Sequence, residues 1–394
     1  MRAYLAVLAV GDARRIVVAL ALTRLGYGMI GLAVVLLAYD VTGSFAIAGL
    51  AVGVFTLASG VLAPLRGSLV DRYGQTRPLV VYVPLYTLFC LALSVATSPA
   101  LIVLLAGLAG AASPPLIASA RPLWAGIVGE DLLRPAYALD SVSMQTTQVI
   151  GPALAGLLAA ATSPRLAVAA LAVLVAAGGA LFMTSRPSRT WRSEARVGGH
   201  GALASRGLRT LLWSGASFGC AIGAIEVGLP ALTALTGSAV DATPYLMVLA
   251  AGSVIGGVAA GLNRRRGPAG MFLLSLTAIV PLIVPLLILG PGLALVAVLL
   301  AIGLVLGPVN IAWYELLDRV APPGTAVTAF TWVVSAELAG VAAGQALAGW
   351  AAEGFSVSLS FGVALLAAAS GAAVGLARRT TLREAYVPAD SGAS

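Results

Sequence analysis

The chain has 394 residues, of which 60% are apolar and only 10% are charged, and its formal net charge is +8. Because soluble globular proteins have a charged fraction of about 25%, this composition excludes that class. With no lysine, two cysteines and one histidine, the chain lacks the residues for a Walker phosphate loop, a Schiff base or a common metal site, so we expect no cofactor, no metal and no enzymatic activity.

Twelve apolar runs follow one another, each of about 20 to 28 residues, long enough to cross a hydrocarbon core of about 30 Å. They predict an all-α membrane protein with twelve transmembrane helices. If the N-terminus is cytoplasmic, 21 of the 23 arginines lie on that side, so the positive-inside rule places both termini in the cytoplasm. The net charge then reflects topology and requires no nucleic acid. An arginine-only, alanine-rich composition indicates a bacterial protein of the cytoplasmic (inner) membrane.

The first run carries an arginine, Arg24, about 12 Å from its cytoplasmic boundary at 1.5 Å per residue. Three interpretations are open: Arg24 binds an anionic substrate, it is the counter-ion of Glu337, or it snorkels to the interface. Tyr27 lies on the same helical face. Both residues are therefore candidates for substrate binding.

A short charged segment separates the second and third runs and contains Gly67, Asp71, Arg72, Gly74 and Arg77. One interpretation is a tight cytoplasmic turn that Gly74 orients, because glycine accepts backbone conformations that other residues avoid. A second interpretation, gating, depends on the family resemblance given below.

The fourth and fifth runs carry two charged residues and a glycine–proline pair. Arg121 and Asp140 lie near cytoplasmic helix ends, where we expect a role in gating or helix capping. Gly151 and Pro152 lie within the fifth run, where they kink the helix and allow close packing with a neighbour.

The longest polar segment between apolar runs divides the chain. The sequence predicts a six-helix bundle over residues 1–185, a cytoplasmic linker over 186–207, a second six-helix bundle over 208–383 and a polar tail over 384–394. An internal duplication relates the two bundles at an offset of 193 residues, so that Gly151 corresponds to Gly344. The two halves therefore run parallel rather than inverted.

Two glutamates break the duplication inside apolar runs, since Glu337 corresponds to Met144 and Glu226 to Ala33. Glu337 lies about 16 Å into the eleventh run, near the midplane, where a carboxyl group is suited to carry protons. Glu226 lies about 12 Å from the outer surface, where it takes up protons or binds a cationic substrate. The alternatives are a hydrogen-bonded carboxyl within the bundle for Glu337 and a hydrated vestibule residue for Glu226.

Further polar and aromatic residues are candidates for substrate binding, because aromatic side chains with a few polar groups form typical small-molecule sites. They are Gln145, Gln148, Asn310, Trp313, Trp332 and Gln345. Helix packing is the alternative for each of them. Glu315 and Asp318 lie near cytoplasmic helix ends and are expected to act in gating. Interfacial aromatic belts are expected to include Trp124, Trp213 and Trp350.

Twelve spans, two parallel halves and a central cytoplasmic loop make the chain resemble the major facilitator superfamily over essentially its whole length. The segment with Gly67, Asp71, Arg72, Gly74 and Arg77 matches the signature of that family between its second and third helices. The resemblance implies that Asp71 holds the two halves together on the cytoplasmic side, by pairing with a helix N-terminus and an arginine.

The fifth run resembles part of the proline–glycine pattern of the drug:proton antiporters in that superfamily. Gly151, Pro152 and Gly156 match its end, whereas Ala138 and Thr147 stand where the pattern has glycines. The mid-helix arginine that many antiporters carry in the fourth span is absent. Antiport and simple helix packing both remain open on this evidence.

We therefore expect a monomeric secondary transporter that works by alternating access in the lipid bilayer, and exports a small hydrophobic or amphipathic substrate in exchange for protons. The alternative is a proton-linked importer or a facilitator of a small polar or anionic metabolite. A lipid flippase or a sensor is a third class, and a membrane enzyme is the least supported by the residues present.

Overall fold

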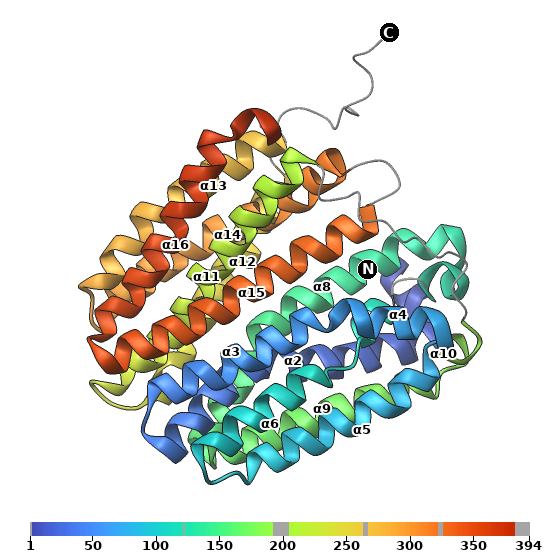
Figure 1. The fold of residues 1–394 in the computed structure, drawn as a ribbon. Coiled ribbons are helices and arrows are strands. Elements are labelled where there is room, and N and C mark those ends of the chain that lie inside the picture. The colour runs from blue at the N-terminus through green and yellow to red at the C-terminus, as the bar shows by residue number, and fades with distance from the viewer. Residues whose placement is uncertain (1, 121–122, 192–204, 263–266, 322–325, 383–394) are drawn as a thin grey trace. The chain divides into compact units, whose positions relative to one another are not determined.

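The structure is a computed structural model that describes residues 2–120, 123–191, 205–262, 267–321 and 326–382 (Figure 1). Within those ranges the regular secondary structure is helical, and no strand occurs. The expected tail at 384–394 and most of the expected linker at 186–207 lie outside the described residues, so both remain predictions.

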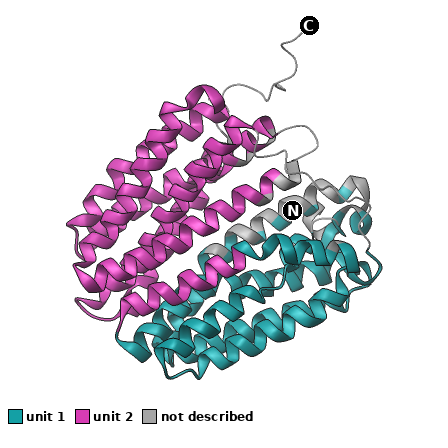
Figure 2. Ribbon diagram, in the orientation of Figure 1, with its two compact units in different colours: residues 1–43, 61–195 teal, residues 44–60, 196–394 magenta. Residues whose placement is uncertain are grey.

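The chain forms two compact units (Figure 2). The first contains residues 1–43 and 61–195, and the second contains residues 44–60 and 196–394. The second unit therefore includes helix α3, which precedes most of the first unit in the sequence. The boundaries expected for the two six-helix halves remain a prediction.

The helices of the first unit are α1 (Arg2–Ala9), α2 (Gly11–Thr42), α4 (Ala63–Tyr73), α5 (Thr76–Ser94), α6 (Pro99–Ala111), α7 (Leu116–Ala120), α8 (Trp124–Ala161), α9 (Pro164–Met183) and α10 (Arg186–Thr190). Those of the second are α3 (Phe45–Val61), α11 (Arg206–Ala234), η3 (Ala239–Ala242), α12 (Thr243–Leu262), α13 (Pro268–Ile283), η4 (Val284–Leu287), α14 (Leu293–Val320), α15 (Ala326–Gly354), α16 (Val357–Ala377) and η5 (Arg379–Leu382).

The expected spans all form helix. In the described part of the chain, nine helical segments are long and apolar enough to cross a membrane, and α3 with the start of α4 forms a tenth, broken span. The other two expected spans are α8, with 38 residues, and α15, with 29 residues, which carry more polar side chains. These elements confirm the prediction of an all-α protein with twelve transmembrane helices.

The internal duplication is visible in how the helices pack. Helix α2 packs against α8 and α9 in the first unit, and α11 packs against α15 and α16 in the second. The offset of 193 residues maps α2 onto α11, α8 onto α15 and α9 onto α16. The contacts of α2 with α8 and α9 in the first unit are therefore repeated by those of α11 with α15 and α16 in the second.

Glycines bring the paired helices of each unit into close contact. Gly344 on α15 lies directly against the backbone of Cys220 on α11. At the corresponding place in the first unit, Gly151 on α8 lies against the backbone of Gly28 on α2. A side chain at Gly344 would overlap with the Cys220 carbonyl, so the close contact requires glycine. Small residues at helix interfaces are typical of membrane bundles.

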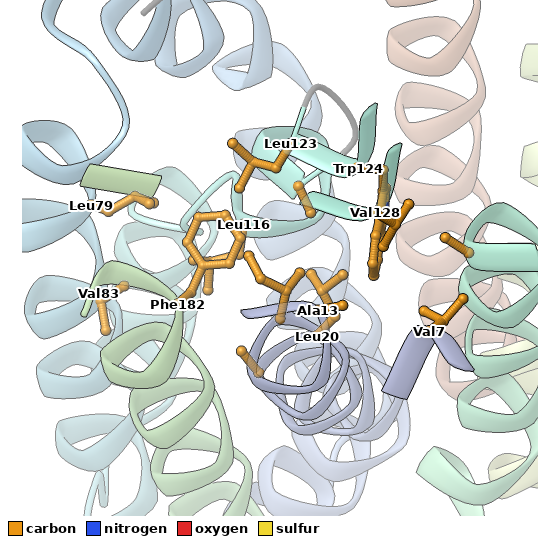
Figure 3. Packing of buried hydrophobic residues seen from close by; sticks show 14 residues of the cluster. Val7, Ala13, Leu20, Leu79, Val83, Leu116, Leu123, Trp124, Val128 and Phe182 are labelled. Atoms are coloured by element: carbon orange, nitrogen blue, oxygen red, sulfur yellow. The ribbon is translucent and has the colours of Figure 1, made fainter. Parts of the chain in front are cut away.

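An apolar core occupies the region where α1, α2, α5, α7, α8 and α9 meet in the first unit (Figure 3). Its largest members are Trp124 and Phe182, each 1% exposed. The expectation that Trp124 lies in an interfacial belt is wrong, because the start of α8 is packed against this core. Trp213 and Trp350, in contrast, expose 55% and 57% of their surface.

Candidate functional site

A buried ion pair joins α2 and α8 in the first unit. Arg24 Nη2 donates to Asp140 Oδ1 at 2.8 Å, and Arg24 Nη1 donates to the Asp140 backbone carbonyl at 2.9 Å. The two side chains are 4% and 18% exposed. Two hydrogen bonds to one residue fix the guanidinium group, and the carboxylate neutralises its charge. Asp140 is therefore a counter-ion of Arg24 within the first unit, and the buried arginine head does not snorkel to an interface. Pairing of Arg24 with Glu337, which belongs to the second unit, remains a prediction.

Tyr27, one turn along α2 from Arg24, interacts with different elements. Its hydroxyl donates to the Pro114 carbonyl at 2.6 Å, and its ring meets the Tyr86 ring edge-to-face, with centroids 5.9 Å apart. Both partners belong to the first unit, in the α6–α7 connection and in α5. This hydrogen bond is structural, and a contact of Tyr27 with substrate remains a prediction.

The fourth span is broken between α6 and α7, where two consecutive prolines remove backbone donors. Because Pro114 and Pro115 lack N–H groups, the carbonyls of Gly110 and Ala111 lose the donors that a continuous helix would supply. Arg66 replaces both, since its Nη1 donates to those carbonyls at 2.8 and 3.1 Å. Its side chain is buried. Sequence reasoning assigned Arg66 only to topology, although the proline pair signals that two carbonyls need a donor.

The charged segment between the second and third spans is mostly helical. Gly67, Asp71 and Arg72 belong to α4, so only Gly74 and Gln75 lie between α4 and α5. Gly74 has a φ of 78°, a conformation that favours glycine. The expected tight turn is therefore present, and it is shorter than the sequence predicts.

Side chains near this turn anchor it within the first unit. Gln75 is fully buried, and its Nε2 donates to the Ser119 carbonyl at the end of α7 at 2.7 Å. The Arg72 guanidinium lies 5.3 Å from the centroid of the Tyr73 ring, and Arg77 is exposed. The Asp71 side chain lies outside the described residues, so its gating contact remains a prediction.

A polar network in the second unit connects α11, α15 and α3. Gln345 Nε2 donates to Glu226 Oε2 at 3.0 Å, and the Thr56 hydroxyl lies 3.0 Å from Gln345 Oε1. Gln345 is only 3% exposed, and Glu226 is partly buried. The structure thus joins a residue expected in proton coupling to one expected in substrate binding. Thr56 was missed, because a lone threonine in an apolar run gives no sequence signal.

Glu337, also on α15, is partly buried, and its backbone carbonyl faces Gly219 on α11. No hydrogen bond or ion pair reaches its carboxylate from the described residues of the second unit. Glu337 therefore differs from Glu226 and Asp140, whose carboxylates both have partners.

The end of α15 holds the start of α3. The Ser44 hydroxyl and the Ala46 amide both donate to Glu353 Oε2, the amide at 2.9 Å. A carboxylate at a helix N-terminus compensates the unpaired N–H groups and the positive end of the helix dipole. This contact at the start of α3 and the hydrogen bond between Thr56 and Gln345 hold α3 to α15 at two separate points along the helix.

The remaining predicted residues lie in varied surroundings. Trp313 is buried, and its ring lies against Gly215 on α11. Asn310 is partly buried, whereas Trp332 and Glu315 are exposed. Pro152, next to the closely packed Gly151, is partly buried. The side chains that lie outside the described part are Arg121, Gln145, Gln148 and Asp318. Among the described residues, no group of three His, Cys, Asp or Glu side chains is able to hold a metal ion.

Comparison with protein families gives a match to the Major Facilitator Superfamily over residues 16–344. Comparison with curated proteins gives no match. A mutant of the nucleoside transporter NupG has the same fold, with a TM-score of 0.79 at 12% identity over 93% of this chain and 98% of that chain. Unmutated NupG gives a TM-score of 0.75 at 14% identity over 95% and 100% of the two chains.

A bacterial homolog of the human lysosomal transporter Spinster, in an inward-facing and occupied conformation, has a TM-score of 0.67 at 17% identity. The match covers 94% of this chain and 98% of that chain. At such identities these similarities show the fold alone.

Proposed function

Because the chain belongs to the major facilitator superfamily, we propose that it is a proton-coupled exporter of a small hydrophobic or amphipathic compound. Its family and fold make it a multi-pass membrane transporter of small molecules rather than an enzyme. On the distribution of arginines we assign it to the bacterial cytoplasmic membrane, with both termini inside, and we expect it to act as a monomer.

The observation that carries the proposal is the carboxylate of Glu337, which has no hydrogen-bond or ion-pair partner among the described residues of its own unit. An ionised group inside a membrane protein is costly unless it has a partner. Arg24 is paired with Asp140, and Glu226 accepts a hydrogen bond from Gln345, whereas Glu337 has no such partner among the described residues. A carboxyl group of this kind is suited to bind and release a proton during each transport cycle.

The charge distribution supports a neutral or cationic substrate over an anionic one. Arg24 is the basic residue deepest in the first span, and an anion would have to displace Asp140 from it. The deep ionisable groups of the second unit are two carboxylates, Glu226 and Glu337. Both features favour export of a neutral or cationic amphipathic compound over transport of an anionic metabolite.

A second candidate is import or facilitated transport of an uncharged polar metabolite. Gln345, Glu226 and Thr56 provide amide, carboxyl and hydroxyl groups that are able to bind such a compound. The nucleoside transporter NupG shares the fold, but the low identity carries no information on this chain's substrate.

Alternating access would use the proton gradient to drive export. One proton supplies about 2.3 kcal/mol per 100 mV and about 1.4 kcal/mol per pH unit. Together these contributions support a substrate gradient of about 10²-fold, which is enough for active export.

The test uses the full-length protein in liposomes that contain a pH-sensitive dye. A proton gradient is imposed, a panel of cationic, neutral and anionic compounds is added, and the wild type is compared with Glu337→Gln. The matched control is Asp40→Asn, which makes the same carboxylate-to-amide change at an exposed position near the end of α2. We expect proton flux evoked by a cationic or neutral compound in the wild type and the control, and its loss in Glu337→Gln. Substrate movement that is equal in all three proteins, without proton flux, would favour a facilitator.

A further inference from the structure

The hydroxyl of Thr56 has two acceptors within reach but only one proton to donate. Its oxygen lies 2.9 Å from the Val52 carbonyl on the same helix and 3.0 Å from Gln345 Oε1 on α15. A threonine hydroxyl donates one hydrogen bond and accepts others. Two arrangements of the network are therefore compatible with the same positions of the heavy atoms.

In the first arrangement the Glu226 carboxylate is ionised and is only an acceptor. Gln345 Nε2 then donates to it, which leaves Oε1 facing α3. Thr56 donates its proton to that oxygen, and its bond to the Val52 carbonyl is lost. Thr56 takes part in one hydrogen bond in this arrangement.

In the second arrangement Glu226 has taken up a proton from water and donates O–H to the amide oxygen of Gln345. The amide has turned by half a rotation, so that Nε2 now faces α3. The contacts of the amide to Glu226 and to Thr56 are both 3.0 Å long, so the nitrogen and oxygen exchange places without moving either helix. Thr56 accepts from Nε2 and donates to Val52, and so takes part in two hydrogen bonds.

We propose that Gln345 is a positioning residue that transmits the protonation state of Glu226 to Thr56 on α3 by rotation of its side-chain amide. Both arrangements give the oxygen and the nitrogen of the Gln345 amide one partner each, so each is a stable state of a buried amide rather than an intermediate. Its use in a transport cycle rests on the proposed proton coupling, but the rotation itself requires only that Glu226 binds a proton.

Other ionisable groups lie away from this network. Glu337 and Glu353 are each eight residues from Gln345 on α15, about 12 Å along the helix axis. Asp241 on η3 accepts from the Ser238 amide in a helix cap. Helices α3 and α16 carry no ionisable side chain. On α11 itself, Cys220 is six residues from Glu226, about 9 Å along the helix axis, and Arg206 and Arg209 lie at the start of the helix. The other titratable or charged groups on elements packed against α11 lie near the ends of those elements, and they are Tyr245, Tyr314, Glu315, Asp318, Arg319 and Arg379.

Thr56 lies on a part of α3 that is closely packed against α15. Gly49 and Gly53 bring α3 into backbone contact with α15, beside the Gln345 and Ala342 carbonyls. The bond between Thr56 and Gln345 is present in both arrangements, whereas the bond from Thr56 to the Val52 carbonyl, within α3, forms only when Glu226 is protonated. The proton on Glu226 and this bond within α3 are therefore linked quantities, and linkage is reciprocal.

The experiment uses the small number of glutamines in the chain, which are Gln75, Gln145, Gln148 and Gln345. Full-length protein labelled with ¹⁵N at the glutamine side chains gives four amide signals, which are followed by NMR in detergent micelles as the pH is varied. The Gln345 signal is identified by its loss in Gln345→Met or, if that variant does not fold, by elimination through variants of the other three. We expect the Gln345 signal to shift with a single midpoint in the wild type and to become independent of pH in Glu226→Gln, in which the new side chain adds a fifth signal.

The coupling between Thr56 and Glu226 is tested by Thr56→Val, which keeps the side-chain shape and removes the hydroxyl. Because Thr56 makes one more hydrogen bond when Glu226 is protonated, its loss is expected to move the midpoint to lower pH by roughly 0.4 to 1 unit. Thr56→Ser restores the hydroxyl and the original midpoint. The control is Thr277→Val on α13, whose hydroxyl donates to the Leu273 carbonyl of its own helix, and which leaves the midpoint unchanged.

The outcomes separate this inference from the proposed function. A Gln345 signal that ignores pH, that titrates equally in Glu226→Gln, or that is unmoved by Thr56→Val overturns the inference even if transport is proton-coupled. A Gln345 signal that follows Glu226 and responds to Thr56→Val supports it even if the liposome assay shows no proton flux.

Discussion

The ion pair between Arg24 and Asp140 predicts a specific pattern of stability in single and double variants. Removing one partner of a buried ion pair typically costs about 3–5 kcal/mol, because the other charge is left uncompensated. Asp140 keeps 18% of its side chain exposed, and Asp140→Asn retains both an amide oxygen and the backbone carbonyl as acceptors for Arg24. We therefore expect a loss of about 2–3 kcal/mol in the free energy of unfolding for Asp140→Asn.

The double variant, Arg24→Gln with Asp140→Asn, removes both charges and should recover part of that loss. Unfolding by SDS from mixed micelles, followed by tryptophan fluorescence, gives the free energies for a double-mutant cycle. The control is Arg165→Gln, which removes a single hydrogen bond to the Ser94 carbonyl and no ion pair. A free energy of unfolding for Asp140→Asn within about 0.5 kcal/mol of the wild type, the size of the effect of a surface substitution, would contradict a stabilising role of the pair. A double-mutant cycle that shows no coupling between Arg24 and Asp140 would contradict it as well.

Three further variants test the packing of the two units. Gly344→Ala should destabilise the second unit by about 1–3 kcal/mol in the same SDS assay, because the added methyl group overlaps with the backbone of α11. The control, Gly354→Ala, places its methyl group in open space at the end of α15 and should be nearly neutral. Arg66→Lys keeps the charge but loses the planar donor group, so about 1–3 kcal/mol should be lost; unchanged stability would show that the α6 carbonyls need no such donor. Trp124→Ala should cost about 3–5 kcal/mol as a core cavity, and Trp350→Ala much less, since Trp350 is exposed; similar losses would contradict the core placement.

The spans and the duplication could be predicted because a bilayer imposes strong constraints on a sequence. A hydrocarbon core of about 30 Å requires about 20 apolar residues, and such runs are visible without any knowledge of tertiary contacts. The offset that pairs Gly151 with Gly344 also predicted equivalent packing, since both glycines lie against the backbone of a neighbouring helix.

The partners of the buried polar residues could not be predicted in the same way. Asp140 is 116 residues from Arg24 and looked like a helix-end residue, so only the tertiary structure reveals the pair. The prolines after α6 remove the donors that a continuous helix would supply to two carbonyls, but several arginines were available and the sequence could not single out Arg66. Trp124 was misplaced because a tryptophan at the start of a span resembles an interfacial anchor, whereas here α8 begins inside the core of the first unit.

The central claim is that substrate leaves while protons enter. The most direct test is the sign of the pH change inside liposomes when a transported compound is added, with the membrane potential clamped at zero. Our account predicts proton movement opposite to the substrate in the wild type and none in Glu337→Gln. Proton movement in the same direction as the substrate, or an unchanged response in Glu337→Gln, would contradict it.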